Sequence, residues 1–316
     1  MSATRSRLNA LGKLKAAAAA VTPAGWAGLA EATGKTASEM DPQDVANSLN
    51  ALGKLKAAAA AVSPAGWAGL AQAVERAAHE MNPQAVGNTL NALSKLEAAG
   101  AAVSPSGWAG LAEAVERTAN EMNEQNVANL LNALSKLKAV AAAVTPAGWA
   151  AMAEATGRRA PEMNPQDVAN TFNALPKLKA AAAAVSWPGW AGLAEAVERT
   201  ASEMDPQNVS NSLNALGKLK AAAAAVTPLG WAGLARAAER TASEMKPQEV
   251  AMTLSAIGVL PAAAAELSPV ARKHLEAAAE REGPNMTSRG REMTLRGCER
   301  LNLRIPNANM DSDFFQ

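Results

Sequence analysis

Apolar and polar residues alternate along the chain with the period of an α-helix, and the whole pattern returns every 41 residues. Val45, Leu49 and Leu52 follow the spacing i, i+4, i+7, which places their side chains on one helical face. Larger side chains keep the same register: the repeating tryptophans are Trp26, Trp67, Trp108, Trp149, Trp190 and Trp231, and the methionines are Met40, Met81, Met122, Met163, Met204 and Met245. An internal period of this length is typical of stacked helical units.

Each repeat carries two signals for the start of a helix. Asp41-Pro42 and Ser63-Pro64 both combine a capping side chain with a proline, which is favoured in the first helical turn. They predict a helix A with Val45, Leu49 and Leu52 on its apolar face, and a helix B that carries the tryptophan and the methionine. We expect both columns of large side chains to pack in the core.

The segment between the two helices is predicted to interrupt helix A. Gly53 and Gly217 share one position of the repeat with Pro176, and proline removes a hydrogen bond inside a helix. Helix A should therefore end, kink or tighten there. The following run, residues 56–61, is rich in alanine and favours a second short helical piece.

These features predict an all-α fold, an α-solenoid of tandem 41-residue two-helix repeats. A single two-helix unit buries its apolar faces only by stacking on neighbouring units. The predicted organisation is a partial N-terminal capping repeat at 1–40, five near-identical repeats at 41–245, a degenerate C-terminal capping repeat at 246–282, and an irregular or disordered tail at 283–316. For residues 1–40, the alternative interpretation is that the chain is a fragment of a longer array. For residues 283–316, which contain several arginines, the alternative is a basic docking segment.

Composition argues against several classes of function. The net charge of +1 predicts no strong whole-chain field, and no apolar run approaches the ~18 residues of a membrane span. One cysteine forms no intramolecular disulfide and no metal cluster, and it fits an intracellular reducing compartment. Neither His79 nor His274 has a visible set of catalytic partners. We therefore expect no enzyme, no cofactor and no membrane association, and a monomeric chain.

Two short motifs are rejected on their context. Gly34-Lys35-Thr36 resembles the end of a phosphate-binding loop, but Leu29 occupies the place of the required glycine and no strand precedes it. The basic and alanine-rich N-terminus resembles a secretory signal. Since the same lysine-alanine segment returns in later copies, it is interpreted as a repeat element.

One polar face of helix A predicts a ligand. Its residues are spaced i, i+4, i+7, i+11, opposite the apolar face, and we call them the stripe. The stripe comprises Gln43, Asn47, Asn50, Lys54, Gln84, Asn88, Asn91, Lys95, Gln125, Asn129, Asn132, Lys136, Gln166, Asn170, Asn173, Lys177, Gln207, Asn211, Asn214 and Lys218. Asparagine forms helices poorly, so a pair of asparagines on the same face of helix A in each of five repeats needs an explanation.

Three explanations of the asparagines stay open. Carboxamides both donate and accept hydrogen bonds, so the columns are suited to base edges, phosphates or a peptide backbone. Alternatively, neighbouring carboxamides bond to one another, or duplication copied a neutral choice. The lysines of the stripe predict a basic ladder beside the amides, while the repeated glutamates lie on helix B. A solvated helix end, favoured by the helix dipole, would also explain those lysines.

The motif Val-Ala-Asn-x-Leu-x-Ala-Leu-x-Lys-Leu, as at Val127–Leu137, resembles the core of octotricopeptide-type repeats. It is also similar to the SKWP repeats of type III effectors from plant-pathogenic bacteria, and Ser94-Lys95 and Ser135-Lys136 match the Ser-Lys of that name. The first resemblance implies an organellar RNA-binding solenoid. The second implies a binding scaffold that is delivered into host cells. Unlike both families, this chain carries its tryptophan on helix B, which weakens any transfer of a base-reading code.

The sequence thus leaves two hypotheses for the ligand. The first is an extended single-stranded RNA held along the stripe, and the second is a peptide or protein held by the same scaffold. Readers of one base per repeat vary at their reading positions, whereas here the asparagine pair is identical in five copies. An RNA target is therefore expected to be of low complexity or bound with tolerance of its sequence. The compartment would be an organelle in the first case and a host cell in the second.

Overall fold

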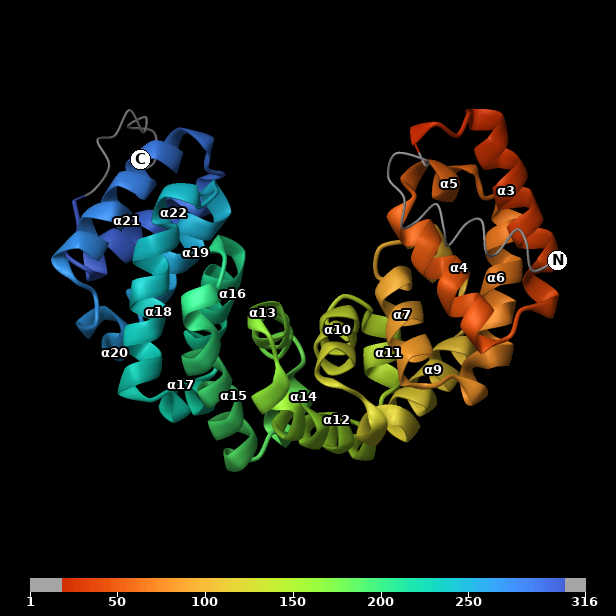
Figure 1. The fold of residues 1–316 in the computed structure, drawn as a ribbon, viewed down its shortest axis with the longest axis horizontal. Helices are drawn as coiled ribbons and strands as arrows, with labels where there is room; N and C mark the ends of the chain where they lie inside the picture. The colour runs from red at the N-terminus through yellow and green to blue at the C-terminus, as the bar shows by residue number, and fades with distance from the viewer. Residues whose placement is uncertain (1–18, 305–316) are drawn as a thin grey trace, which may run out of the picture. The chain divides into compact units, whose positions relative to one another are not determined.

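The computed structural model describes residues 19–304, and this part of the chain contains helices and turns without any strand. Each repeat contributes a helix A, a short helix and a helix B, and a 3-10 turn then leads into the next helix A (Figure 1). The A helices are α4 (Pro42–Lys54), α7 (Pro83–Leu93), α10 (Glu124–Leu134), α13 (Pro165–Ala174), α16 (Pro206–Leu216), α19 (Pro247–Ile257) and α22 (Ser288–Arg300). The B helices are α3 (Pro23–Thr36), α6 (Pro64–Ala77), α9 (Pro105–Thr118), α12 (Pro146–Arg159), α15 (Trp187–Thr200), α18 (Pro228–Thr241) and α21 (Pro269–Glu282).

The remaining elements are short. The helices between A and B are α5 (Lys56–Ala61), α8 (Glu97–Ala102), α11 (Lys138–Ala143), α14 (Lys179–Ala184), α17 (Lys220–Ala225) and α20 (Pro261–Ala265). The 3-10 turns are η1 (Ala37–Glu39), η2 (Ala78–Glu80), η3 (Ala119–Glu121), η4 (Ala160–Glu162), η5 (Ala201–Glu203), η6 (Ala242–Glu244) and η7 (Gly283–Asn285). The 41-residue helical repeat predicted from the sequence is confirmed.

Capping side chains start both helices of the repeat. The Asp41 Oδ1 atom accepts a hydrogen bond of 2.7 Å from the backbone nitrogen of Asp44, and the Ser63 Oγ atom accepts one of 3.1 Å from that of Gly66. Each bond satisfies one of the free N–H groups at a helix N-terminus. The two predicted start signals are therefore confirmed as N-caps.

Helix A ends where the sequence predicted an interruption. Leu55, the residue between α4 and α5, has φ −106° and ψ 80°, outside the helical region, and its side chain is buried. Leu96 and Leu178 repeat this conformation before α8 and α14. The break falls at this leucine in each of these repeats, and the alanine run then forms the short helix that was expected.

The chain divides into two compact units, one made of residues 1–155 and 180–184 and the other of residues 156–179 and 185–316. In the first unit, α4, α7 and α10 form one layer, while α3, α6 and α9 form the other. In the second, α13, α16, α19 and α22 form one layer, while α15, α18 and α21 form the other. Each unit is thus a layer of A helices packed on a layer of B helices.

The core of both units holds the repeating large side chains. The tryptophan column is between 4% and 9% exposed, and Met81, Met122, Met163 and Met204 are fully buried. Val45, Leu49 and Leu52 are at most 1% exposed. The expectation that both columns pack in the core is confirmed.

Glycine allows a close approach of neighbouring B helices at two places. Gly34 and Gly157 occupy the position that holds Glu75 in another copy. A Cβ atom on Gly157 would lie 2.9 Å from the Gly189 Cα atom, and one on Gly34 would lie 3.0 Å from the Gly66 Cα atom. At these two places the backbones lie so close that a side chain would push the two helices apart.

The end of the chain differs from the prediction. Residues 283–316 were predicted to form an irregular or disordered tail, but η7 and α22 occupy residues 283–300. Met286 lies 41 residues after Met245, so α22 is a further helix A in register, the seventh within residues 19–304. Arginines and glycines replace its usual apolar and amide residues, which hid the repeat. Helix α22 packs on α19 and so continues the A-helix layer beyond the predicted capping repeat at 246–282.

Parts of both terminal assignments lie outside the described residues. The predicted capping repeat at 1–40 is described from residue 19 onward, where α3 is its helix B and Thr22 is the N-cap. Residues 305–316 of the predicted tail, with Phe314 and Phe315, are likewise outside the description. No helix within residues 19–304 is long and apolar enough to cross a membrane.

Candidate ligand-binding surface

The stripe lies on the A-helix layer of both units, and its residue types differ regularly in exposure. In all five copies the glutamine and the lysine are exposed, while both asparagines are half-buried. The adjacent A helices pack side by side, which covers part of each carboxamide. The stripe therefore presents an exposed polar group at each end of the helix and two partly desolvated amides in the middle.

The asparagines of the stripe are not used to hold the helices together. Among residues 19–304, the one hydrogen bond to a stripe carboxamide is from the Lys177 Nζ atom to the Asn173 Oδ1 atom, at 3.1 Å. No hydrogen bond joins carboxamides of neighbouring A helices in this part of the chain. Mutual bonding, one of the three explanations given above, is therefore wrong for this structure, and the donor and acceptor groups stay available for a ligand.

Three lysines of the predicted ladder, Lys54, Lys95 and Lys136, are exposed in the first unit. Partial burial lowers the pKa of the Lys95 ammonium group, and the positive charges of Lys136 and Lys54 lower that pKa further. Charges influence one another in this way only when they are close. The three lysines thus lie at or just beyond the C-terminal ends of α4, α7 and α10, which pack side by side.

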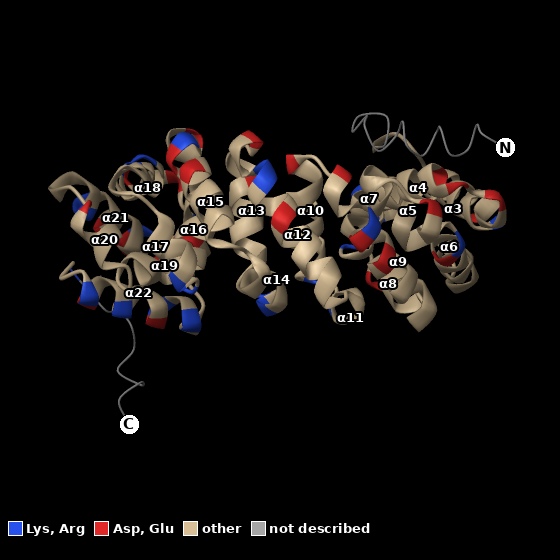
Figure 2. Ribbon diagram, turned by 90° about the horizontal axis from the view of Figure 1, so that it is seen from below, with Lys and Arg blue, Asp and Glu red and all other residues tan. Residues whose placement is uncertain are grey.

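A second basic region lies on α22 in the other unit. Burial lowers the pKa of Lys218, and the charge of Arg289 lowers that pKa further. In the 41-residue register, Arg289 corresponds to the stripe glutamine, Arg296 to the second asparagine and Arg300 to the lysine. In Figure 2, basic positions of the α22 ribbon lie along one edge of this unit. Helix α22 thus carries arginine at three of the four stripe positions and Met293 at that of the first asparagine.

The stripe positions of α22 were not predicted from the sequence, because residues 283–316 were assigned to a tail. The methionine register was the signal that would have found it, since Met286 continues the spacing of the six earlier methionines. The preceding A helix, α19, lacks the asparagines and the lysine of the stripe. Met252, Ser255 and Val259 replace its two asparagines and its lysine.

The glutamates of helix B are engaged within their own layer. The Glu75 carboxylate accepts hydrogen bonds from Ser104 Oγ at 2.7 Å and from Ser106 Oγ at 2.5 Å. These two hydroxyls lower the pKa of Glu75. In the next repeat, Thr145 Oγ1 donates to Glu116 at 2.6 Å. Acidic groups are therefore concentrated on the B-helix layer, as the sequence predicted, and the stripe remains basic.

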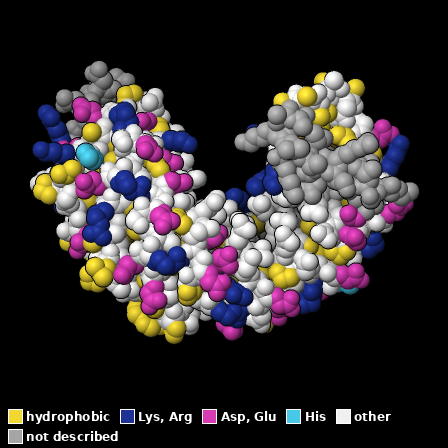
Figure 3. Space-filling view, in the orientation of Figure 1, with side chains coloured by type: hydrophobic (Ala, Val, Ile, Leu, Met, Phe, Trp, Pro, Cys, Tyr) yellow, Lys and Arg dark blue, Asp and Glu magenta, His cyan; other side chains and the backbone are white. Residues whose placement is uncertain are grey.

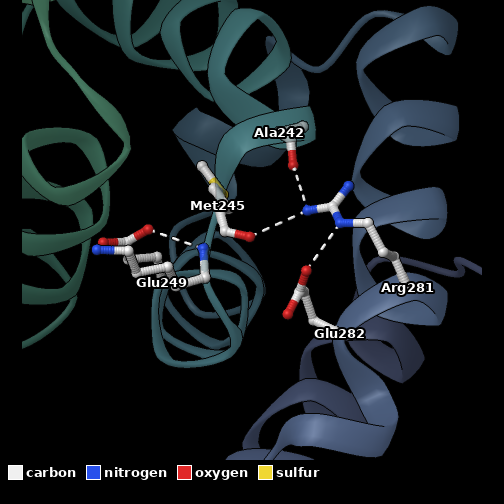
Figure 4. Close-up of polar contacts among 6 residues, drawn as sticks. Ala242, Met245, Glu249, Arg281 and Glu282 are labelled. Carbon is white, nitrogen blue, oxygen red and sulfur yellow. Dashed lines mark hydrogen bonds and ion pairs between the residues drawn. The ribbon is translucent and has the colours of Figure 1, made fainter.

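A row of arginines also belongs to the B-helix layer, and we call it the arginine ladder. Its members donate to backbone carbonyls at the 3-10 turn of the preceding repeat; they are Arg76, Arg117, Arg199, Arg240 and Arg281. Figure 4 shows the last member: Arg281 donates to Met245 O at 3.0 Å and to Ala242 O at 3.1 Å. These arginines join successive repeats, and they are not available as a basic surface.

Comparison with known proteins supports the repeat and gives no activity. A family model described as "Protein of unknown function (DUF1601)" matches residues 69–90, 110–131, 150–172 and 192–213. Each match begins in helix B, crosses the 3-10 turn and ends in the following helix A. No curated protein matches the chain. Within residues 19–304, no cluster of three histidine, cysteine or acidic side chains is placed to hold a metal ion.

Proposed function

We propose that this tandem-repeat scaffold binds single-stranded RNA along the stripe, with little preference for base sequence. The observation that carries the proposal is that α4, α7 and α10 pack side by side and that an exposed lysine lies at or just beyond the C-terminal end of each, namely Lys54, Lys95 and Lys136. Like charges in a row repel one another, and an extended polyanion relieves that repulsion. The arginines at the stripe positions of α22 supply a further site for phosphates.

The two residue types of the stripe suggest a division of roles. Lysines and arginines contact phosphate oxygens, and arginine does so through two parallel hydrogen bonds. The half-buried carboxamides donate to and accept from base edges or ribose hydroxyls. Because the same asparagine pair recurs in all five copies, it cannot distinguish one base from another along the strand. These roles favour a sequence-tolerant binder.

The alternative occupant of the stripe is a peptide backbone, which carboxamides also recognise. The two occupants differ in their response to salt, because phosphate contacts release counterions and contacts to a peptide backbone do not. Both hypotheses retain the scaffold and differ in the charge of the ligand. A salt titration therefore separates them.

The test measures binding of labelled RNA homopolymers over a range of salt concentrations. The variant Lys54→Gln, Lys95→Gln, Lys136→Gln should reduce the slope of log K against log salt by about 2, since each phosphate contact on a single strand contributes about 0.7. A second variant, Asn88→Ala, Asn129→Ala, Asn170→Ala, should weaken binding with the slope retained. The matched control, Lys35→Gln, Lys246→Gln, Lys273→Gln, removes equal charge away from the stripe and should leave the slope unchanged.

Circular dichroism of each variant establishes that the helices are retained. Absence of binding by the folded wild type would contradict the proposal and favour the peptide scaffold. Equal slopes for the stripe variant and the control variant would also contradict it, because the stripe lysines would then contact no phosphate.

A further inference from the structure

The B-helix layer of the second unit contains an open groove of about 1080 Å³ that is separate from the stripe. It runs between α18 and α21, with residues of α15 and η5 at its side. Its floor consists of small residues, among them Gly233, Ala237 and Ala277. A Cβ atom on Gly233 would lie 3.1 Å from the Ala201 Cβ atom, so the floor is closely packed and bulk is confined to the rims.

The groove is polarised along its length. At the N-terminal ends of the two helices, Leu229 and Val270 line it with side chains that are 66% and 50% exposed. Toward the C-terminal ends, Arg236, Arg240 and Arg281 line it. Figure 3 shows hydrophobic side chains at the outer edge of this unit, next to rows of charged ones. An amphipathic ligand with an apolar end and an anionic end fits this arrangement.

The residues that give the groove its character depart from the rest of the array. The position of Leu229 is occupied by alanine at residues 65 and 147, and by serine at residue 106. The position of Arg236 is occupied by glutamate in four other copies. Since the other repeats fold with these residues, the fold does not require an exposed leucine or a reversed charge. Exposed apolar side chains in a groove are typical of a binding site.

The hydrogen bonds of the groove leave a positive charge without a partner. The carboxylate of Glu198 accepts from Thr227 Oγ1, and that of Glu239 accepts from Ser268 Oγ at 2.8 Å. Arg240 and Arg281 belong to the arginine ladder and donate to carbonyls of the preceding turns. Arg236 makes no hydrogen bond or ion pair within residues 19–304. The groove therefore complements a carboxylate.

We infer that this groove binds a short acidic peptide segment of a partner protein, with a large apolar side chain at one end. The apolar side chain contacts Leu229 and Val270, and carboxylates of the segment contact Arg236. The α18 wall from Leu229 to Arg240 is about 16 Å long at 1.5 Å per residue. That length matches about five residues of extended peptide. The inference does not depend on RNA binding by the stripe.

The experiment selects a displayed library of random linear peptides on the full chain and measures the affinity of the enriched peptides by titration. The groove variant is Leu229→Ala, Arg236→Glu, Val270→Ala, in which the first two changes introduce residues that the array already holds at those positions. Enriched peptides should contain aspartate or glutamate beside an aromatic or aliphatic anchor. The groove variant should bind them at least about tenfold more weakly, which is about 1.4 kcal/mol.

The matched control changes the same helix positions in the first unit: Ser106→Ala, Glu113→Gln, Ala147→Ser. It should bind the enriched peptides as tightly as the wild type, and circular dichroism compares the helix content of all three proteins. Equal affinity for the groove variant and the wild type would overturn the inference. So would a selection that enriches no acidic peptide.

Discussion

Single arginines connect residues that are far apart in the sequence. The Arg117 guanidinium donates to the carbonyl oxygen of Met81 at 2.9 Å and to that of Ala78 at 3.3 Å, and these partners lie 36 and 39 residues earlier. The carbonyls at the end of a helix otherwise lack partners. The arginine thus satisfies the end of one repeat from the next, and this role explains why a charged residue recurs beside a buried column.

This role gives a prediction for Arg117→Ala. Loss of two charge-assisted hydrogen bonds should lower the free energy of unfolding by about 1–2 kcal/mol, because hydrogen bonds to charged groups stabilise more than neutral ones. Urea unfolding followed by circular dichroism measures the change. The control Glu113→Ala removes an exposed side chain from the same helix and should stay within about 0.5 kcal/mol of the wild type. A loss no larger than that of the control would contradict the bridging role.

At the scale of the element, the packing of α22 on α19 converts a polar segment into part of the fold. Met286, Cys298 and Leu301 are buried, although arginines occupy much of the helix. A Cβ atom on Gly297 would lie 2.6 Å from the Leu254 carbonyl carbon and 2.7 Å from its oxygen. Backbone atoms cannot move aside cheaply, so this glycine sets how closely the two helices approach.

Cys298 reports whether α22 is packed. Burial, together with the charge of Glu276, raises the pKa of its thiol to about 11. The thiolate is the reactive form, so labelling of the folded protein near pH 8 should be slow. Gly297→Ala should displace α22 from α19 and increase the labelling rate by at least about tenfold, through exposure and a lower pKa of the thiol.

The control for this measurement is Gly283→Ala, where an added Cβ atom meets nothing within 4 Å. Its labelling rate should equal that of the wild type, measured with an aromatic disulfide reagent under the same conditions. If Gly297→Ala were labelled at the control rate, the contact between Gly297 and Leu254 would not set the position of α22.

At the scale of the whole molecule, a net charge of +1 conceals a separation of charge between the two layers of each unit. In the B layer, glutamates accept hydrogen bonds from hydroxyls of the next repeat, and the arginine ladder donates to carbonyls of the preceding one. The lysines of the A layer, in contrast, remain exposed. The balance of the whole chain therefore underestimates the field at the stripe. Local charge, not net charge, decides which polyion a repeat scaffold attracts.

The α22 arginines give a prediction at this scale, which rests on the proposed RNA binding. The variant Arg289→Gln, Arg296→Gln, Arg300→Gln should reduce the slope of log K against log salt by about 2, as the lysine variant of the first unit does. The same titration with RNA homopolymers measures it, with the Lys35, Lys246, Lys273 variant as the control. An unchanged slope would restrict RNA contacts to the first unit.

The sequence was sufficient for the repeat length, the helix starts and the face on which the stripe lies. These depend on local signals: caps such as Asp41, prolines in the first turn, and apolar spacing along a single helix. The approximate place of the break after helix A was also local, since Pro176 cannot continue a helix, although α4 runs through Gly53 and ends only at Lys54. The part of the candidate site that lies within one helix was therefore predictable.

Contacts between repeats were decided by the tertiary structure alone. The arginine ladder joins residues 36 to 39 apart, and the groove gathers Leu229, Arg236 and Val270 from two helices. The spacing of residues within one helix does not reveal contacts between residues that lie this far apart in the sequence. The assignment of α22 as a seventh helix A also depended on its packing, because Gly297 and Cys298 fit against α19 while the helix has few apolar residues of its own. Local propensity set each helix, and the burial of one helix on another determined which helices belong to the array.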